Sequence, residues 1–186
     1  QQGGADILQR AGFFGCGRRL AEEALQLLLA ANCPSGKMDL LLMPEQMMLQ
    51  IHESIGHPLE LDRILGDERN YAGTSFVTLD MFGEYQYGSP LLNVTYDPSH
   101  PEEIASFAYD DDGTRAEKVF LIRNGVLERP LGGHISQSRA AKPGVANSRA
   151  SSWNRAPIDR MANLNVEPGK TPFDDMIANI ERGILM

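Results

Sequence analysis

Apolar residues near the start of the chain follow two patterns, one helical and one extended. From Arg19 to Ala31, leucine and alanine recur on one face of a helix, among residues that form helices well. Asn32 to Gly36 contains a proline and a glycine, which end helices. Met38 to Met43 is an unbroken apolar run of strand length, so we expect a strand that is buried on both faces.

A second helical pattern begins directly after this run. Pro44 suits the first position of a helix, and the following glutamate places a negative charge where the helix dipole favours it. The side chains expected on its core face are Met47, Met48, Ile51 and Ile55. A strand that leads into this helix would be a rigid mount for functional side chains.

From residue 71 onwards the pattern changes to the alternation that is typical of strands. Residues 71–96 predict two or three strands, and residues 158–166 predict another. Asn124-Gly125 lies between two apolar runs, which predicts a β-hairpin over residues 118–129.

The segments between these strands are shorter or more polar. We expect a short helix at residues 102–107 and an acidic turn at residues 110–114. Residues 131–154 are polar and without periodicity, which predicts a long loop. Thr171 and Pro172 suit the cap and the first position of a last helix.

Together these elements predict an α+β fold with a mixed or antiparallel sheet and two to four helices, in which the helix after Pro44 lines a cleft. We expect residues 1–70 to form a helix–strand–helix part, and residues 71–186 a β-rich part with the hairpin, the long loop and the last helix. The 186 residues are enough for a sizeable core. The chain begins with Gln-Gln-Gly-Gly, so we interpret it as an internal piece of a longer protein.

Charge and composition narrow the class of protein. A net charge of −8 argues against a nucleic-acid-binding protein, because neutralising phosphates requires an excess of Lys and Arg. No apolar stretch is long enough to cross a bilayer, so we expect no membrane association. Cys16 and Cys33 are too few and too scattered for a disulfide framework, which fits a cytoplasmic protein.

The residues with the clearest chemical meaning are His52, Glu53 and His57, a His-Glu-x-x-x-His motif on the second helix. Two neutral imidazoles can hold a zinc ion, and a carboxylate beside them can take a proton from water on the metal. The spacing is one residue longer than in the helix signature of zinc proteases. On a regular helix, side chains five residues apart diverge by about 140°, so the two histidines could not reach one ion.

Gly56 and Pro58 bracket the second histidine and offer a way to turn it. Glycine permits unusual backbone angles, and proline disfavours the helical region for the residue before it, which is His57. We therefore expect the helix to loosen at Gly56, either as a one-residue bulge or as its C-terminal end. The alternative is that the two histidines are unrelated surface residues around a helix end.

Other polar residues are secondary candidates for the site. In the long loop, His134 and Arg139 are candidates for substrate contacts, and Arg139 belongs to a cationic stretch that could hold a peptide carboxylate. Glu60 and Asp62 lie just after the motif, and either could stand in as a metal ligand. His100 lies beside a proline, where we expect a surface turn.

The order of several motifs resembles that of the TldD/PmbA family of zinc metallopeptidases, and specifically its TldD-like branch. The resemblance runs from about Arg19 to the C-terminus. The motifs that carry it are, in chain order, His52-Glu53-x-x-Gly56-His57, the Asp-Asp-Gly turn that ends at Gly113, the hairpin around Asn124-Gly125, and Arg160-Met161-x-Asn163.

The resemblance implies a function and a set of ligands. It makes His52 and His57 zinc ligands, and Glu53 the general base of a peptidase that cleaves flexible or unfolded peptides. In that family the third ligand is a cysteine from a segment well beyond the hairpin and the last helix, a position that neither Cys16 nor Cys33 matches. We therefore expect zinc in the full-length protein, but weak or absent zinc and no activity in this chain alone.

The resemblance also implies a homologous partner subunit, in a homo- or heterodimer around an enclosed cavity. If residues 71–96 form strands, these could bind an extended peptide through its backbone, which selects flexible substrates over sequence. Two rival interpretations remain. The chain could be a non-catalytic structural or peptide-binding subunit, although a scaffold has no reason to keep all three motif residues. It could also be a metal-dependent hydrolase of a non-peptide amide.

Overall fold

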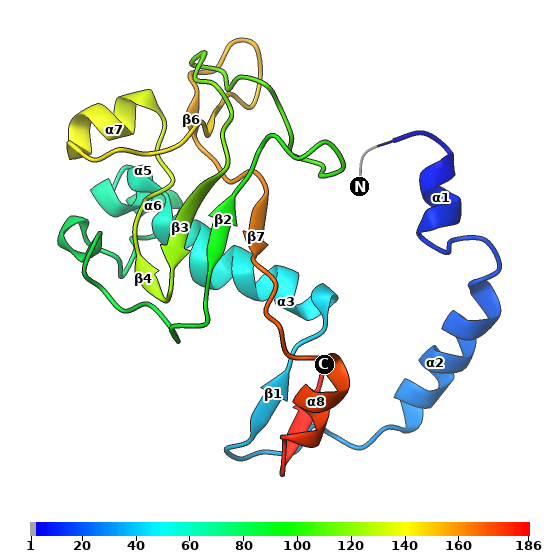
Figure 1. Cartoon of the computed structure of the whole chain (residues 1–186). Helices are drawn as coiled ribbons and strands as arrows, with labels where there is room; N and C mark the ends of the chain where they lie inside the picture. Colours follow the sequence, from blue (N-terminus) through cyan, green and yellow to red (C-terminus); the bar gives the residue numbers. More distant parts are fainter. Residues whose placement is uncertain (1–2) are drawn as a thin grey trace.

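The computed structural model describes residues 3–186, and its central element is a four-stranded antiparallel sheet (Figure 1). The strands lie in the order β4-β3-β2-β7, so β3 and β2 are interior and β4 and β7 are at the ends. Together with the helices beside it, this sheet confirms the α+β class. The bounds are Val94–Tyr96 for β2, Val119–Arg123 for β3, Val126–Leu127 for β4 and Leu164–Val166 for β7.

Strands β3 and β4 form the predicted hairpin around Asn124-Gly125. Both residues have positive φ angles, 49° and 78°, which the favoured two-residue hairpin turn requires. Gly125 is also crowded, because a Cβ there would lie 2.1 Å from the side-chain nitrogen of Gln86. The hairpin over residues 118–129 is therefore confirmed.

A row of short helices lies beside the sheet and contains the His-Glu-x-x-x-His motif. Helix α3 (Pro44–Ile51) continues into a π-helical segment (His52–Gly56) and the short α4 (His57–Leu59), and α5 (Leu61–Leu65) follows. The core forms where this row meets the sheet (Figure 1). Its buried members are Ile55, Leu59, Val77, Phe82, Val94, Tyr96, Leu121, Ile122, Leu127, Leu131 and Val145.

The expected core face of the motif helix is only partly buried. Ile55 is 6 % exposed, whereas Met48 is 68 % exposed. The difference arises because α3 extends past the sheet and borders an open groove, so its apolar side chains line that groove instead of the core.

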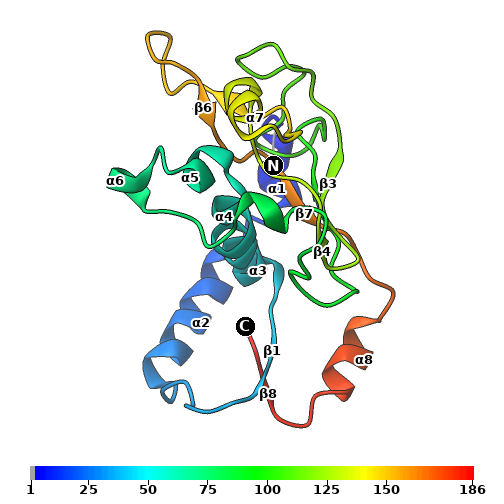
Figure 2. The ribbon, with the colours of Figure 1, turned by 90° about the vertical axis from the view of Figure 1, so that its left-hand side faces the viewer.

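Strand β1 (Asp39–Leu41) lies away from this core. It pairs in parallel with β8 (Gly183–Leu185) in a separate two-stranded sheet (Figure 2). No residue of β1 is buried, and Leu40 is 55 % exposed. The apolar run does form a strand, but the expected burial on both faces is wrong, because β8 is its only strand partner within residues 3–186.

Helices α1 (Asp6–Arg10) and α2 (Gly17–Leu29) precede β1 and stand apart from the sheet (Figure 1). Helix α2 is the helix predicted from residue 19, with its start two residues earlier. None of its residues is buried, and Leu28 on its apolar face is 80 % exposed. The amphipathic pattern therefore predicted the helix correctly. Its apolar face, however, is not buried against any other part of residues 3–186.

The expectation of two or three strands in residues 71–96 is wrong. The segment contains one strand, β2, preceded by a 3₁₀ turn (Leu79–Met81), and α6 (Arg69–Ala72) overlaps its start. Most of its aromatic residues lie outside strands: Phe82 is buried in the core, and the ring of Tyr87 contacts the rings of Phe76 and Tyr85.

Two connecting segments also differ from their predictions. Residues 102–107 form turns instead of a helix, because the N–H of Phe107 bonds to the carbonyl of Pro98. Residues 131–154 are not a continuous loop. They contain α7 (His134–Ala140) and β5 (Ser148–Arg149), elements too short to show a hydrophobic period.

The last part of the chain is close to its prediction. Residues 158–166 contain two strands instead of one, namely β6 (Ile158–Asp159), which pairs with β5, and β7. Helix α8 (Phe173–Ala178) begins one residue later than expected, so Pro172 occupies the cap position.

Candidate metal centre

The π-helical segment changes the spacing of the motif. The N–H of His57 donates to the carbonyl of His52, five residues back, where an α-helix would use the residue four back. This wider turn returns the second ring to the side of the first. The ring centroids of His52 and His57 lie 4.5 Å apart, with an angle of 89° between the planes. The one-residue bulge, one of the two forms expected here, is therefore confirmed.

The bulge brings three possible ligand atoms together. One atom from each of His52, Glu53 and His57 lies within 4.8 Å of the other two, and no other group of this kind was found among the described residues. His52 and Glu53 are exposed, and His57 is half-buried. A donor set of two imidazoles and a carboxylate is one that zinc accepts.

Gly56 allows this geometry through its lack of a side chain. Its backbone is helical, with φ −56° and ψ −68°, so the unusual angles expected of this glycine are absent. A Cβ at this position would lie 1.8 Å from Sδ of Met161 and 3.0 Å from Cδ1 of Leu164. The position therefore requires glycine because the segment before β7 packs directly on the helix backbone.

Pro58 also acts differently from the prediction. His57 has helical angles, φ −58° and ψ −41°, so the expected bias away from the helix is wrong. Proline instead removes the N–H that an α-helix would direct at the carbonyl of Ser54. That carbonyl accepts a hydrogen bond from the hydroxyl of Tyr87. Burial raises the pKa of Tyr87 to about 12, so its hydroxyl stays protonated and can donate.

Glu60 orients the second histidine. Its side chain is fully buried, and its Oε2 lies 2.9 Å from Nδ1 of His57. Nη2 of Arg63 lies 3.3 Å from the same nitrogen. The closer carboxylate makes Nδ1–H the donor, and the Arg63 guanidinium pairs with the carboxylates of Glu60 and Glu68. Nε2 of His57 then keeps its lone pair, as in the carboxylate–histidine pairs of zinc sites.

From the sequence, Glu60 was expected only as a possible substitute for a metal ligand. The structure gives it a positioning contact, and the signal that could have found it is the His57-Pro-Leu-Glu60 spacing, which places the two side chains on one face of a turn. Asp62, the other substitute considered, faces a different cavity.

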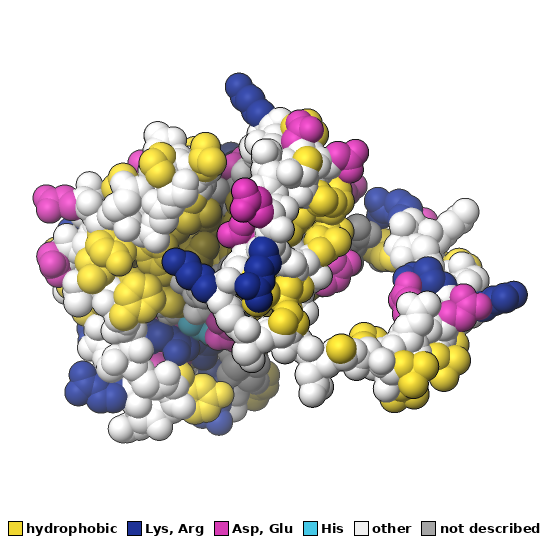
Figure 3. All heavy atoms as spheres, turned by 90° about the horizontal axis from the view of Figure 1, so that it is seen from below, with side chains coloured by type: hydrophobic (Ala, Val, Ile, Leu, Met, Phe, Trp, Pro, Cys, Tyr) yellow, Lys and Arg dark blue, Asp and Glu magenta, His cyan; other side chains and the backbone are white. Residues whose placement is uncertain are grey.

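The motif opens into a cavity of about 510 Å³. Its wall contains both acidic and basic side chains. Nη1 of Arg160 lies 3.0 Å from Oε1 of Glu68, and Glu68 also pairs with Arg63. In the space-filling view a histidine side chain lies recessed between basic and acidic side chains (Figure 3). The site is thus a polar hollow in which Glu68 pairs with both Arg63 and Arg160.

A groove of about 610 Å³ extends from His52 between α3 and β7. Met47, Met48 and Ile51 form one wall, and residues 161–166 form the other. Glu102, Glu103 and Ile104 also line the groove, and Nδ2 of Asn165 in β7 donates to Oε2 of Glu103 at 3.4 Å.

The other candidate residues lie outside the motif cavity. His134 begins α7 and is exposed, and Arg139 lies on the same helix. Both guanidinium nitrogens of Arg139 bond to the carboxylate of Asp67. Arg139 is therefore already paired, and the substrate roles of these two residues stay predictions. His100 lies in an exposed turn, as expected.

No helix among residues 3–186 combines the length and the apolar character that crossing a membrane demands.

Known proteins share both the sequence and the fold of this chain. A family model described as the PmbA/TldA metallopeptidase C-terminal domain matches residues 35–186. The chain is 33 % identical over 184 residues to a metalloprotease of Methanothermobacter thermautotrophicus, which covers 99 % of this chain and 38 % of that protein. It is 25 % identical over 166 residues to a zinc metalloprotease TldD homolog of Saccharolobus solfataricus, which covers 88 % of this chain and 35 % of that protein.

The chain thus spans little more than a third of the length of these relatives. A crystal structure from Thermotoga maritima, of a protein described as a candidate modulator of a DNA gyrase, matches the fold with a TM-score of 0.70 and 25 % identity. That match covers 91 % of this chain and 36 % of the other. The chain therefore belongs to the PmbA/TldD metallopeptidase family, and residues 35–186 correspond to its C-terminal domain.

Proposed function

We propose that the full-length protein is a zinc-dependent peptidase that cleaves flexible or unfolded peptides, with His52, Glu53 and His57 at its centre. The observation that carries the proposal is the convergence of three ligand atoms within 4.8 Å on one π-bulged helix. The buried contact from Glu60 to His57 supports it, because it leaves Nε2 available to a metal. The name of the Saccharolobus relative also supports zinc.

His52 and His57 would hold the metal, and we assign the third ligand to a cysteine outside residues 1–186, as in the family. A bound zinc ion would polarise the scissile carbonyl and lower the pKa of a water molecule. Glu53 lies beside both imidazoles and is exposed to the cavity, so it can take a proton from the attacking water and deliver it to the leaving amine. Glu60 keeps His57 in the tautomer that leaves Nε2 unprotonated.

The edge of β7 is the best candidate for holding an extended substrate. The earlier candidate, a strand within residues 71–96, fails because β2 is paired with β3 on one side and β7 on the other. Strand β7 instead has β2 as its one strand partner within residues 3–186, and its residues line the groove that reaches His52. A peptide that adds to this edge would be held through its backbone and directed towards the histidines, which selects flexible chains.

We further propose that the protein works in the cytoplasm with a homologous partner subunit. The free thiols of Cys16 and Cys33 support a reducing compartment. The family resemblance supports the partner, and the exposed apolar face of α2 offers a surface for one.

The experiment is cleavage of a panel of unstructured peptides by the zinc-loaded full-length protein and its Glu53→Gln variant. We expect cleavage to fall at least about 100-fold in Glu53→Gln while zinc content is unchanged, because only the general base is lost. Glu45→Gln, on the exposed side of α3, is the matched control and should cleave normally.

Each failure points to a different error. Wild-type rates in Glu53→Gln would remove this residue from the mechanism. Hydrolysis of small amides without peptide cleavage would make the protein another kind of hydrolase. A full-length protein that binds no metal would be a non-catalytic subunit.

A further inference from the structure

A second cavity, of about 430 Å³, adjoins the motif cavity and shares Glu68, Tyr71 and Arg160 with it. We propose that this second cavity, the acidic pocket, binds a cationic group of the peptide substrate, either a basic side chain or the terminal amine. The proposal rests on the proposed peptidase function and concerns the part of the substrate next to the cleaved bond.

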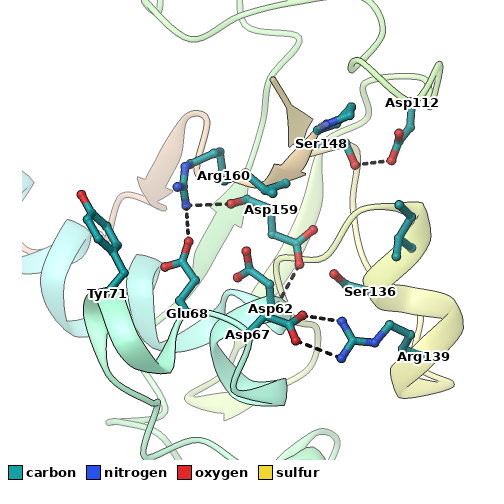
Figure 4. Close-up of a pocket in the computed structure, with 13 residues that line it drawn as sticks. Asp62, Asp67, Glu68, Tyr71, Asp112, Ser136, Arg139, Ser148, Asp159 and Arg160 are labelled. Carbon is teal, nitrogen blue, oxygen red and sulfur yellow. Dashed lines mark hydrogen bonds and ion pairs between the residues drawn. The ribbon is translucent and has the colours of Figure 1, made fainter. Parts of the chain in front are cut away.

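Segments far apart in sequence build the acidic pocket, as Figure 4 shows: α5 with the turn after it, α7, and the paired strands β5 and β6. Asp159 joins them. Its Oδ2 accepts from the N–H of Asp62 at 3.0 Å, and its Oδ1 accepts from the N–H of Gly133 at 2.7 Å. The pocket is therefore held by buried hydrogen bonds across 97 and 26 residues.

The arginines of the pocket are already paired. Arg139 makes two bonds to Asp67, one of them 3.0 Å long. Arg160 lies 3.0 Å from Glu68. In Figure 4 both guanidinium groups point at these carboxylates. Their hydrogen bonds and ion pairs to acidic side chains go to Asp67 and Glu68, and not to Asp62, Asp112 or Asp159.

Asp62 is one of three acids in the pocket that bond to no oppositely charged side chain among the described residues. It is 6 % exposed, and Oδ1 accepts from the N–H of Arg63 at 2.7 Å. Its second oxygen has no hydrogen-bond partner among residues 3–186, and Figure 4 shows the carboxylate between Glu68 and Asp159. A carboxylate on a residue that is only 6 % exposed is costly without a positive partner, and a cation in the pocket would lower that cost.

Two further carboxylates receive only neutral donors. Asp159 is 3 % exposed and bonds to backbone N–H groups, and Asp112 accepts from the hydroxyl of Ser148. Burial, followed by the charge of Asp159, raises the pKa of Asp62 to about 7, and burial also raises that of Asp159. The lining therefore contains more acidic than basic side chains: Asp62, Asp67, Glu68, Asp112 and Asp159 against Arg139 and Arg160.

The remaining wall favours an organic cation over a metal ion. Ile135, Pro157 and Ile158 give the pocket an apolar side, against which the aliphatic stem of a lysine or arginine can pack. The acids themselves do not converge: within residues 3–186 the only cluster with metal-ligand spacing is the histidine motif. A lysine or arginine side chain, which is aliphatic along its length and charged at its end, matches both the apolar wall and the acids.

The test measures cleavage of matched peptides by the zinc-loaded full-length protein. Lysine and norleucine are compared at each position around the cleaved bond, and a free terminal amine is compared with its acetylated form. We expect kcat/KM to be about tenfold higher for the cationic member at one position, because one charge-assisted hydrogen bond is gained. The position that shows the preference separates a basic side chain from the terminal amine.

Two variants locate this preference. Asp62→Asn should abolish it while cleavage of the norleucine peptide continues, and Asp174→Asn on α8, with the same change of charge, should keep it. Ile135→Lys places a cation at the pocket wall without altering a buried group, and should compete with the substrate cation, whereas Ile135→Gln should not. Equal rates for lysine and norleucine, or a preference that survives both Asp62→Asn and Ile135→Lys, would overturn the proposal.

Binding separates this proposal from the proposed function. The Glu53→Gln full-length protein should bind a fluorescent lysine peptide about tenfold more tightly than its norleucine counterpart in an anisotropy assay. If no peptide is cleaved but this preference is present and depends on Asp62, the pocket stands and the peptidase proposal fails. If peptides are cleaved without any preference, the reverse holds.

Discussion

Substitution of Gly56 by alanine tests why the helix bulges where it does. If this glycine served only to loosen the backbone, alanine would keep the helical angles and stabilise the helix by about 0.8–1 kcal/mol. The structure predicts the opposite sign. The new Cβ would lie 1.8 Å from Sδ of Met161, so the segment before β7 must move.

The magnitude follows from two opposing contributions. Extra volume in a packed site costs about 1–3 kcal/mol, and the gain in helix propensity offsets part of it, which leaves a net loss of about 1 kcal/mol for Gly56→Ala. In a Met161→Ala background the contact is gone, so adding Gly56→Ala should cost nothing or stabilise by up to about 1 kcal/mol. The expected coupling between the two positions is therefore about 2 kcal/mol.

The assay is denaturant unfolding of four full-length proteins: the wild type, Gly56→Ala, Met161→Ala and the double variant. Zinc affinity is measured on the same four proteins. Because His57 follows Gly56 directly, the single variant should also bind zinc more weakly than the double variant. Stabilisation by Gly56→Ala in the wild-type background, or the same change in both backgrounds, would refute the packing explanation.

Three further predictions concern the neighbours of the motif. Glu60→Gln should weaken zinc binding about 10–100-fold in a competition titration, because the contact that orients His57 is weakened, and unchanged affinity would contradict that role. Asp62→Asn should stabilise the protein at pH 8 by about 2 kcal/mol, allowing for solvent in the pocket, but not at pH 4. The sign follows because the folded pKa of about 7 lies above the ordinary value of 3.8, so folding favours the protonated carboxyl and the penalty grows as pH rises from about 4 to 7. Equal thermal unfolding at both pH values would contradict it. Tyr87→Phe should cost about 1 kcal/mol, since the carbonyl of Ser54 loses its donor, and an unchanged unfolding midpoint would show that water replaces the hydroxyl.

Local signals in the sequence predicted local structure well. Asn124-Gly125 determines its hairpin through backbone angles that few other residues accept, and Pro44 begins its helix as expected. The five-residue spacing of the histidines predicted that the helix either bulges or ends at Gly56, and the structure shows the bulge.

Features that depend on distant segments could not be predicted. The reason for Gly56 is Met161, which is more than a hundred positions away, and the acidic pocket needs Asp62 and Asp159 to meet across 97 residues. The exposure of β1 follows from its pairing with β8 at the other end of the chain. Single-sequence patterns contain no information on such contacts, so the burial of β1 was predicted wrongly and the pocket was missed.

The central claim is that His52 and His57 bind the same metal ion, and X-ray absorption at the zinc edge of the full-length protein tests it most directly. If both histidines bind the ion, the spectrum should show two imidazole nitrogen ligands at about 2.0–2.1 Å. The His57→Ala variant should show one imidazole ligand fewer. A spectrum without imidazole ligands, or one that His52→Ala and His57→Ala both leave unchanged, would contradict it.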